Sequence, residues 1–149
     1  MGGGGSKSKS SSARAGGDNF SAEQMNLSGS EKQVAWAKDI VKGAFENLDN
    51  QIKQREKALD DDITDIAKRH GLTKAAVRKA NFSNPNSAPS QDKLWIDTAK
   101  EYKTKSMENF KKLPFNFPAS NIIDARQGMT TEAMINAVNI LVRQKKNKR

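Results

Sequence analysis

The sequence predicts an all-α protein, a small helical bundle with a flexible N-terminal tail rich in Gly, Ser and Lys and a basic C-terminal end. Apolar residues recur at steps of three and four along several segments, which is the spacing of one helix face. Residues that favour helix caps, and glycines that stop helices, flank those segments. No segment of useful length alternates apolar and polar residues with the period of two typical of a half-buried strand.

The first 27 residues are predicted to form a tail, ahead of a helical domain over residues 28–142 and a basic tail over residues 143–149. The opening stretch MGGGGSKSKSSSARAGG contains no large apolar side chain after Met1, so it cannot bury enough surface to offset the entropy lost on ordering. Its four glycines do not indicate a phosphate loop, because no strand precedes them and no Gly-Lys-Ser/Thr follows at the required spacing.

The first predicted helix begins after Ser30, a favourable N-cap, with Gln33 at the spacing of a capping box. The pattern extends to about Leu59, and a helix of that length spans roughly 45 Å. Because this is long for so small a domain, we expect a bend, with Gly43 as a candidate position. The apolar face consists of Val34, Ala37, Val41, Ala44, Phe45, Leu48 and Ile52.

A separate second helix is predicted to begin at one of three consecutive aspartates, since Asp favours helix N-caps and N-terminal turns. Gly71 is predicted to end this helix, and Thr73 to cap a third one. The aspartates are Asp60, Asp61 and Asp62, and the apolar residues of the third helix are Ala76, Val77 and Ala80.

Two further long helices and one short helix are predicted in the second half of the chain. NFSNPNSAPSQD has the composition of a loop, and Ser90 or Asp92 then begins a helix that carries Trp95, Ala99, Tyr102 and Phe110 on one side. The prolines of LPFNFPAS end it, and two phenylalanines there are expected to fill the core. A short helix over Asn121–Gln127 ends at Gly128. The two phenylalanines of LPFNFPAS are Phe115 and Phe117. The last helix is predicted to begin near Thr130, and its apolar face consists of Met134, Val138, Leu141 and Val142.

The net charge of +9 is concentrated at the two ends of the chain. Residues 1–17 carry +3 and residues 139–149 carry +5, which leaves +1 for residues 18–138. Basic ends attract DNA and other polyanions in a salt-sensitive manner, although a solubilising tail explains the same composition. The chain has no cysteine, no apolar run of membrane-spanning length and no secretory signal, so we expect a protein of the host cytoplasm or a virion, with no membrane partner.

The stretch DITDIAKRHGLTKAAVRKA begins at Asp62 and predicts a helix-turn-helix-like unit over residues 62–81. A small residue at Ala67, a turn glycine at Gly71 and a cap at Thr73 have the required spacing. The stretch resembles the lac-repressor type of helix-turn-helix. That resemblance implies DNA contacts from Thr73, Lys74, Arg78 and Lys79. The positive charge of the C-terminal end separately predicts phosphate contacts from Arg143, Lys145, Lys146, Lys148 and Arg149. The nearby aspartates would repel phosphate, and a plain helical hairpin satisfies the same spacing.

The segment GSEKQVAWAKDI resembles the opening of small uncharacterised proteins encoded by Firmicutes phages and mobile elements. Many of those proteins later carry a W-I-D-x-R-like stretch, for which LWIDTAK and NIIDARQ compete here. The resemblance implies a mobile-element origin. Trp36 is expected at the edge of the core, with a partner-binding anchor as the alternative. Asp124 and Arg126 are expected to form an ordinary ion pair, with a role in partner binding as the alternative.

No pattern in the sequence indicates catalysis, a metal site or a cofactor. There is no cysteine nucleophile, and the single histidine, His70, lies at a predicted helix end. The sequence therefore supports two function hypotheses. The first is a phage or mobile-element protein that binds DNA, and the second is a protein-binding module. The module would be a virion component or an inhibitor of a host enzyme or defence complex, of the anti-CRISPR type.

Overall fold

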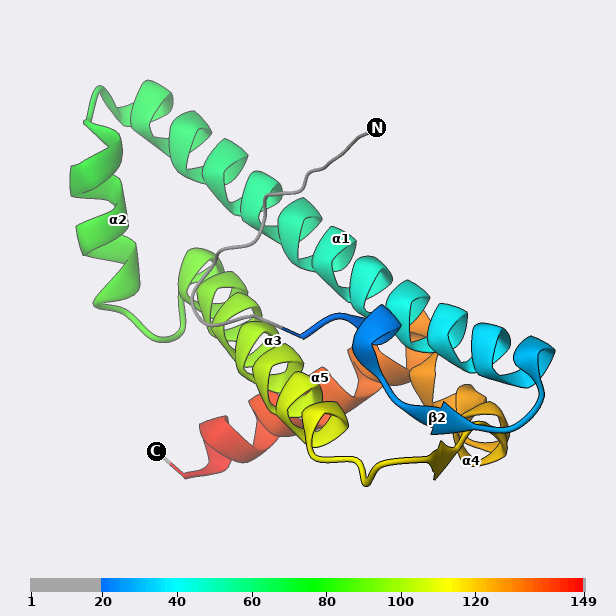
Figure 1. Cartoon of the computed structure of the whole chain (residues 1–149). Coiled ribbons are helices and arrows are strands. Elements are labelled where there is room, and N and C mark those ends of the chain that lie inside the picture. Colours follow the sequence, from blue (N-terminus) through cyan, green and yellow to red (C-terminus); the bar gives the residue numbers. More distant parts are fainter. Residues whose placement is uncertain (1–19, 149) are drawn as a thin grey trace, which may run out of the picture.

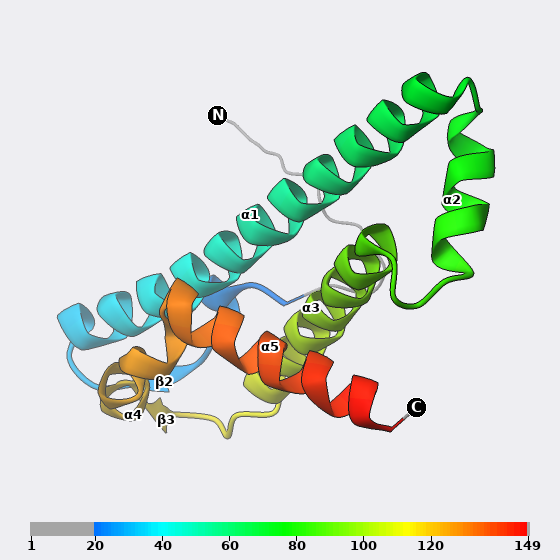
Figure 2. The same cartoon turned by 180° about the vertical axis from the view of Figure 1, so that it is seen from behind.

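The computed structural model describes residues 20–148 and confirms the all-α prediction (Figure 1). Helix α1 (Glu31–His70) runs the length of the molecule. Helix α2 (Lys74–Phe82) turns back from its C-terminal end, and α3 (Ala88–Lys111) and α5 (Thr131–Asn147) pack against its middle. Seen from behind, α5 crosses α3 and ends away from α4 (Figure 2). No helix among the described residues is long and apolar enough to cross a membrane.

Short elements close the bundle beside the N-terminal half of α1. They are the 3-10 helices η2 (Ala22–Gln24) and η3 (Arg126–Met129), the helix α4 (Ala119–Asp124), and two strands of two residues, β2 (Leu27–Ser28) and β3 (Phe117–Pro118). The strands pair in parallel, with Leu27 opposite Phe117. They are the sole strands of the described residues, so they do not change the fold class.

The structure confirms the predicted helix start after Ser30 and the predicted helix end at Gly71, but not a break between them. Ser30 and Gln33 form the capping box, and Gly71 ends the helix with a φ of 63°. The expected bend at Gly43 and the expected new start at Asp60–Asp62 were both wrong, because α1 is one uninterrupted helix. Exposed aspartates lower helix stability only slightly, and the ion pair between Lys57 and Asp61 offsets part of that cost.

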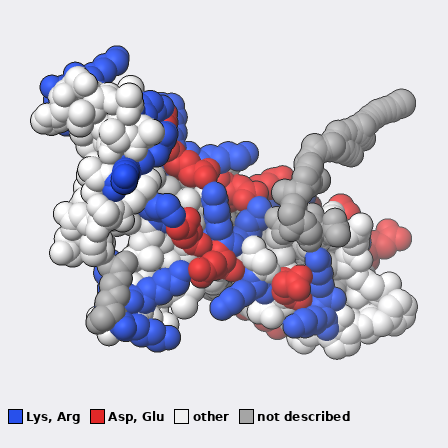
Figure 3. Space-filling view, turned by 90° about the vertical axis from the view of Figure 1, so that its left-hand side faces the viewer, with Lys and Arg blue, Asp and Glu red and all other residues white. Residues whose placement is uncertain are grey.

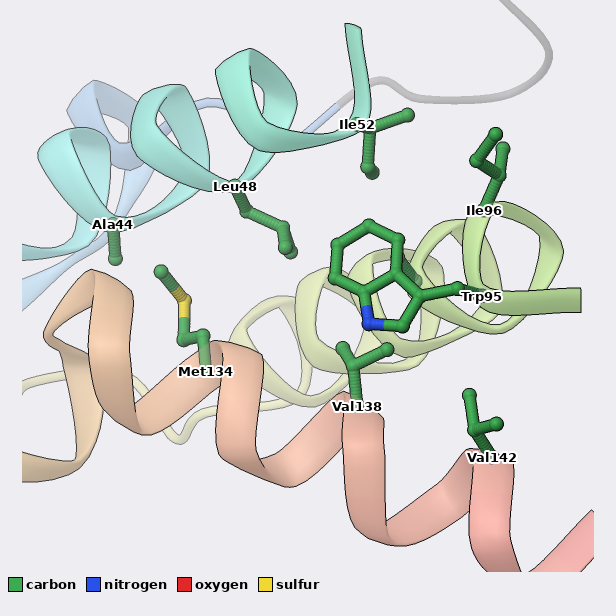
Figure 4. Close-up of a cluster of buried hydrophobic side chains, with 9 residues drawn as sticks. Ala44, Leu48, Ile52, Trp95, Ile96, Met134, Val138 and Val142 are labelled. Carbon is green, nitrogen blue, oxygen red and sulfur yellow. The ribbon is translucent and has the colours of Figure 1, made fainter. Parts of the chain in front are cut away.

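The central core lies where α1, α3 and α5 meet (Figure 4). The Trp95 indole lies between Leu48 and Ile52 of α1 on one side and Val138 of α5 on the other. Its Nε1 donates a hydrogen bond of 2.8 Å to Oδ1 of Asn139. The Arg55 guanidinium lies 4.4 Å from the centre of the indole ring. Trp95 is 5% exposed and joins all three helices.

Residues 20–27, which were predicted as part of the N-terminal tail, do not form a tail. Residues 1–19 lie outside the described residues, but residues 20–27 pack on the bundle. Phe20 contacts Phe45 and Phe110, with ring centroids 5.8 and 6.1 Å away. Ala22 and Met25 are buried beneath the same cluster. This contact was missed because the segment is too short and irregular to show an apolar period.

Two predicted boundaries around α3 and one predicted core residue are corrected. The cap of α3 is Ser87, not Ser90 or Asp92, and Pro89 lies in its first turn, where a missing N–H costs nothing. Phe117 is half-buried beside α4 as expected, but Phe115 is 78% exposed. The predicted helix Asn121–Gln127 is α4 followed by η3.

The last helix begins as predicted, since the Thr130 side chain accepts from the Ala133 N–H. It does not end at Arg143, where the basic tail was predicted to begin. The helix continues to Asn147, so most of the predicted basic tail is helical. Lys and Arg have high helix propensity and are favourable near the negative end of the helix dipole.

Candidate nucleic-acid interface

The turn between α1 and α2 places Gly71 and Thr73 at the turn and at the helix cap that the sequence predicted for them. Gly71 adopts the left-handed conformation, and the Leu72 N–H donates to the Ala67 carbonyl. The Thr73 hydroxyl accepts from the Ala76 N–H and caps α2. A small apolar cluster of Ile63, Ala67 and Val77 joins the two helices. The predicted anchor Ala80 is exposed, so α2 is held mainly by Val77.

Two of the predicted DNA-contacting side chains are bound by one carboxylate of α1. Nζ of Lys74 lies 2.9 Å from Oδ1 of Asp60, and a terminal guanidinium nitrogen of Arg78 lies 3.1 Å from the same oxygen. The hydrogen bond from Lys74 lowers the pKa of Asp60 below its ordinary value of 3.8. An aspartate is ionised at neutral pH even at its ordinary pKa, so Asp60 is charged when it contacts Lys74 and Arg78.

The remaining predicted residues of α2 face solvent. Thr73 is exposed and uses its hydroxyl as the helix cap. Lys79 is exposed, and no carboxylate of residues 20–148 lies within ion-pair distance of it. Arg78 also lines a groove of about 290 Å³ between α1, α2 and α3. Lys79 can thus contact a polyanion directly. Lys74 and Arg78 must first separate from Asp60.

The C-terminal end of α5 presents most of the other predicted cations. Lys145 Nζ lies 2.9 Å from both carboxylate oxygens of Glu101 on α3. Arg143, Lys146 and Lys148 are exposed, and none of them has a carboxylate partner among the described residues. Arg149 lies outside that range. Among these cations, Lys145 is thus ion-paired, whereas the other three face solvent.

The two groups of cations do not join into one basic face. Figure 3 views the α2 end of the molecule and shows Lys and Arg side chains interspersed with Asp and Glu side chains. Several of these charges are paired within or between helices, as in the contacts of Lys93 with Asp97 and of Lys100 with Glu56. On this side of the molecule, the charges of these lysines are therefore neutralised locally.

The three predicted partner-binding residues divide into a contacting pair and one isolated acid. Trp36 is 49% exposed, and the Arg126 guanidinium lies 5.4 Å from the centre of its ring. Arg126 also donates to the Ile123 carbonyl, at 2.7 Å, so it does not pair with Asp124 as expected. Asp124 is exposed at the end of α4. Trp36 packs against none of the hydrophobic clusters of the described residues, so its expected place at the core edge was wrong.

No group of three or more His, Asp or Glu side chains within residues 20–148 is placed to hold a metal ion. His70 is exposed at the last residue of α1. The absence of an enzymatic function therefore stays a prediction that rests on the sequence.

Sequence reasoning missed two contacts, Asp60 with Lys74 and Trp36 with Arg126. Both join residues from different helices, so no local spacing reveals them. A weak signal existed for the first, because four aspartates directly precede a cluster of five cations. Opposite charges flanking a tight turn are often brought together when the chain folds back.

No protein-family model, curated protein or solved structure matches the chain. The resemblances to lac-repressor-type proteins and to small phage proteins therefore stay predictions.

Proposed function

We propose that the chain is a nucleic-acid-binding protein whose attraction for phosphate comes chiefly from the C-terminal end of α5. The observation that carries this proposal is the difference between two groups of cations. Arg143, Lys146 and Lys148 are exposed without a carboxylate partner among the described residues, whereas Lys74 and Arg78 share Asp60. A free cation gains the full benefit of releasing counterions from a phosphate backbone. A paired cation must first give up its carboxylate.

Stabilisation of α5 is the simplest alternative explanation for these cations. The C-terminal end of a helix carries about half a negative elementary charge. One well-placed cation compensates it, and Lys145 already lies near that end. Three further exposed cations exceed what the helix dipole requires, so they leave a net positive surface that attracts polyanions.

Sequence-specific contact through α2 is a secondary part of this proposal. In a helix-turn-helix complex, the first helix crosses the DNA backbone and the N-terminal end of the second helix reaches the base edges. Here Asp60 lies against the first residue of α2, Lys74. A phosphate approaching that end meets a carboxylate, so we expect weaker binding through α2 than through α5.

The test compares two triple variants that lose the same charge. One carries Arg143→Gln, Lys146→Gln and Lys148→Gln. The control carries Lys57→Gln, Lys93→Gln and Lys111→Gln, three lysines held by carboxylates of their own helices. Fluorescence anisotropy with a labelled DNA duplex at about 50 mM salt should show binding at least about tenfold weaker for the first variant. The control should bind within about threefold of the unmodified chain.

Equal weakening of the two variants would mean that net charge alone matters and that α5 has no special role. If the full-length chain has no measurable affinity for duplex DNA at that salt concentration, the nucleic-acid proposal is wrong.

A second function, a protein-binding module of a virion or of a host-defence inhibitor, is favoured by one observation. Trp36 is half exposed and its ring is held by Arg126, and Trp and Arg are enriched among the residues that dominate protein interfaces. For this function, Trp36→Ala should abolish complex formation in size-exclusion chromatography while leaving the melting temperature nearly unchanged. Leu72→Ala is the control, because Leu72 is 52% exposed at the opposite end of α1.

A further inference from the structure

Two cations of α2 converge on one carboxylate oxygen of α1. Lys74 and Arg78 occupy successive turns of α2, and their nitrogens lie 2.9 and 3.1 Å from a single oxygen, Oδ1 of Asp60. Two cations that meet at one oxygen provide the charge and the hydrogen bonds that a phosphate oxygen requires. The carboxylate of α1 therefore stands where a ligand oxygen would bind.

This site is open to solvent. The side chains of Lys74, Arg78 and Asp60 are 42%, 45% and 50% exposed. Exposed ion pairs contribute little to stability, because water solvates both partners when they separate. A competing anion can therefore replace Asp60 without burying an unpaired charge.

Three carboxylates near Asp60 are engaged elsewhere. Across the adjacent groove, Glu56 is held by Lys100 and Asp97 by Lys93. On α1, the next residue, Asp61, is held by Lys57 at 2.9 Å. Asp60 is thus the carboxylate of this region that contacts Lys74 and Arg78.

We infer that the Lys74–Arg78 pair is a binding site for a nucleic-acid phosphate and that Asp60 is its internal competitor. In the free chain Asp60 occupies the site. When a nucleic acid binds, a phosphodiester oxygen exchanges with the carboxylate, and α2 adds its two cations to the contacts made by α5. This inference rests on the proposed function, because it assumes that the partner is a polyanion.

The experiment compares Asp60→Asn with Asp61→Asn in the full-length chain. Each variant removes one negative charge from α1 and frees a lysine, but only Asp60→Asn frees cations of α2. Anisotropy with a fluorescein-labelled DNA duplex at about 50 mM salt should show binding tighter by about three- to fivefold for Asp60→Asn. Asp61→Asn should change the affinity by less than about twofold. Adding Lys74→Gln and Arg78→Gln to Asp60→Asn should remove the gain.

Equal tightening by the two variants would contradict the inference, because it would report net charge alone. Unchanged binding by Asp60→Asn would also overturn it while leaving the proposed function intact, provided that the unmodified chain binds. If none of the variants nor the unmodified chain binds the duplex, both the inference and the proposed function are wrong.

Discussion

Trp95 of α3 and Asn139 of α5 are joined by a hydrogen bond of 2.8 Å between the indole Nε1 and the amide Oδ1. The Trp95 side chain is almost wholly buried, so this bond satisfies the polar group of a core residue. Lys145 and Glu101 make a second contact between the same two helices. These two contacts fix the direction in which α5 projects its basic end.

Replacing Asn139 with alanine should therefore destabilise the protein by about 1–3 kcal/mol, because a buried donor loses its acceptor. The control is Asn136→Ala, on the exposed side of the same helix, which should change stability by less than about 0.5 kcal/mol. Chemical denaturation measures both. Similar losses for the two variants would show that the hydrogen bond is unimportant.

The two tryptophans should differ sharply in their contribution to stability. Trp95→Ala leaves a cavity between three helices and should cost about 3–5 kcal/mol. Trp36→Ala removes an exposed ring and its contact with Arg126, and should cost about 1 kcal/mol or less. The melting temperatures of the two variants test this difference, and a large drop for Trp36→Ala would contradict the exposed position of its ring.

Two glycines of the first helical segment should respond oppositely to alanine. Gly71 has a φ of 63°, and a Cβ there meets no atom within 4 Å, so the cost of Gly71→Ala is the backbone conformation alone, about 1–2 kcal/mol. Gly43 lies inside α1 with equally open space around it. Gly43→Ala should stabilise the protein by about 0.5–1 kcal/mol. Urea denaturation of the two variants is sufficient to compare them, and destabilisation by Gly43→Ala would contradict the uninterrupted course of α1.

The features predicted correctly from the sequence are those fixed by neighbouring residues. The Ser30–Gln33 capping box, the left-handed Gly71 and the Thr73 cap each depend on contacts within one turn of helix. The apolar face from Ala37 to Ile52 was also predicted, because burial imposes its own period on the sequence.

The features that the sequence did not predict depend on distant packing or on competition between two local preferences. Asp60 favours a helix start in isolation, but the packing of Ile52 and Ile63 on either side keeps α1 helical through it. The helical state of Lys145 is supported by Glu101, which is far away in the sequence. The cations of the candidate site, Lys74 and Arg78, were predicted from the sequence, but their contact with Asp60 was not.

The pKa of Asp60 should depend on its contacts with Lys74 and Arg78. The hydrogen bond from Lys74 lowers the pKa of Asp60 below 3.8, so its contribution to stability is present at neutral pH and is lost as the pH falls through the folded-state pKa. In a Lys74→Gln, Arg78→Gln variant, that pKa should rise towards its ordinary value. Carboxyl carbon NMR measures it directly. An unchanged titration would show that the cations do not engage Asp60 in solution.

The salt dependence of duplex binding tests most directly whether the end of α5 supplies the phosphate contacts. The logarithm of the association constant falls with the logarithm of salt concentration by about 0.9 for each phosphate neutralised. We expect the Arg143→Gln, Lys146→Gln, Lys148→Gln variant to have a slope shallower by about 2–3 than that of the unmodified chain. The Lys57→Gln, Lys93→Gln, Lys111→Gln control should keep the original slope. Identical slopes for all three proteins would contradict the proposal that α5 contacts phosphate.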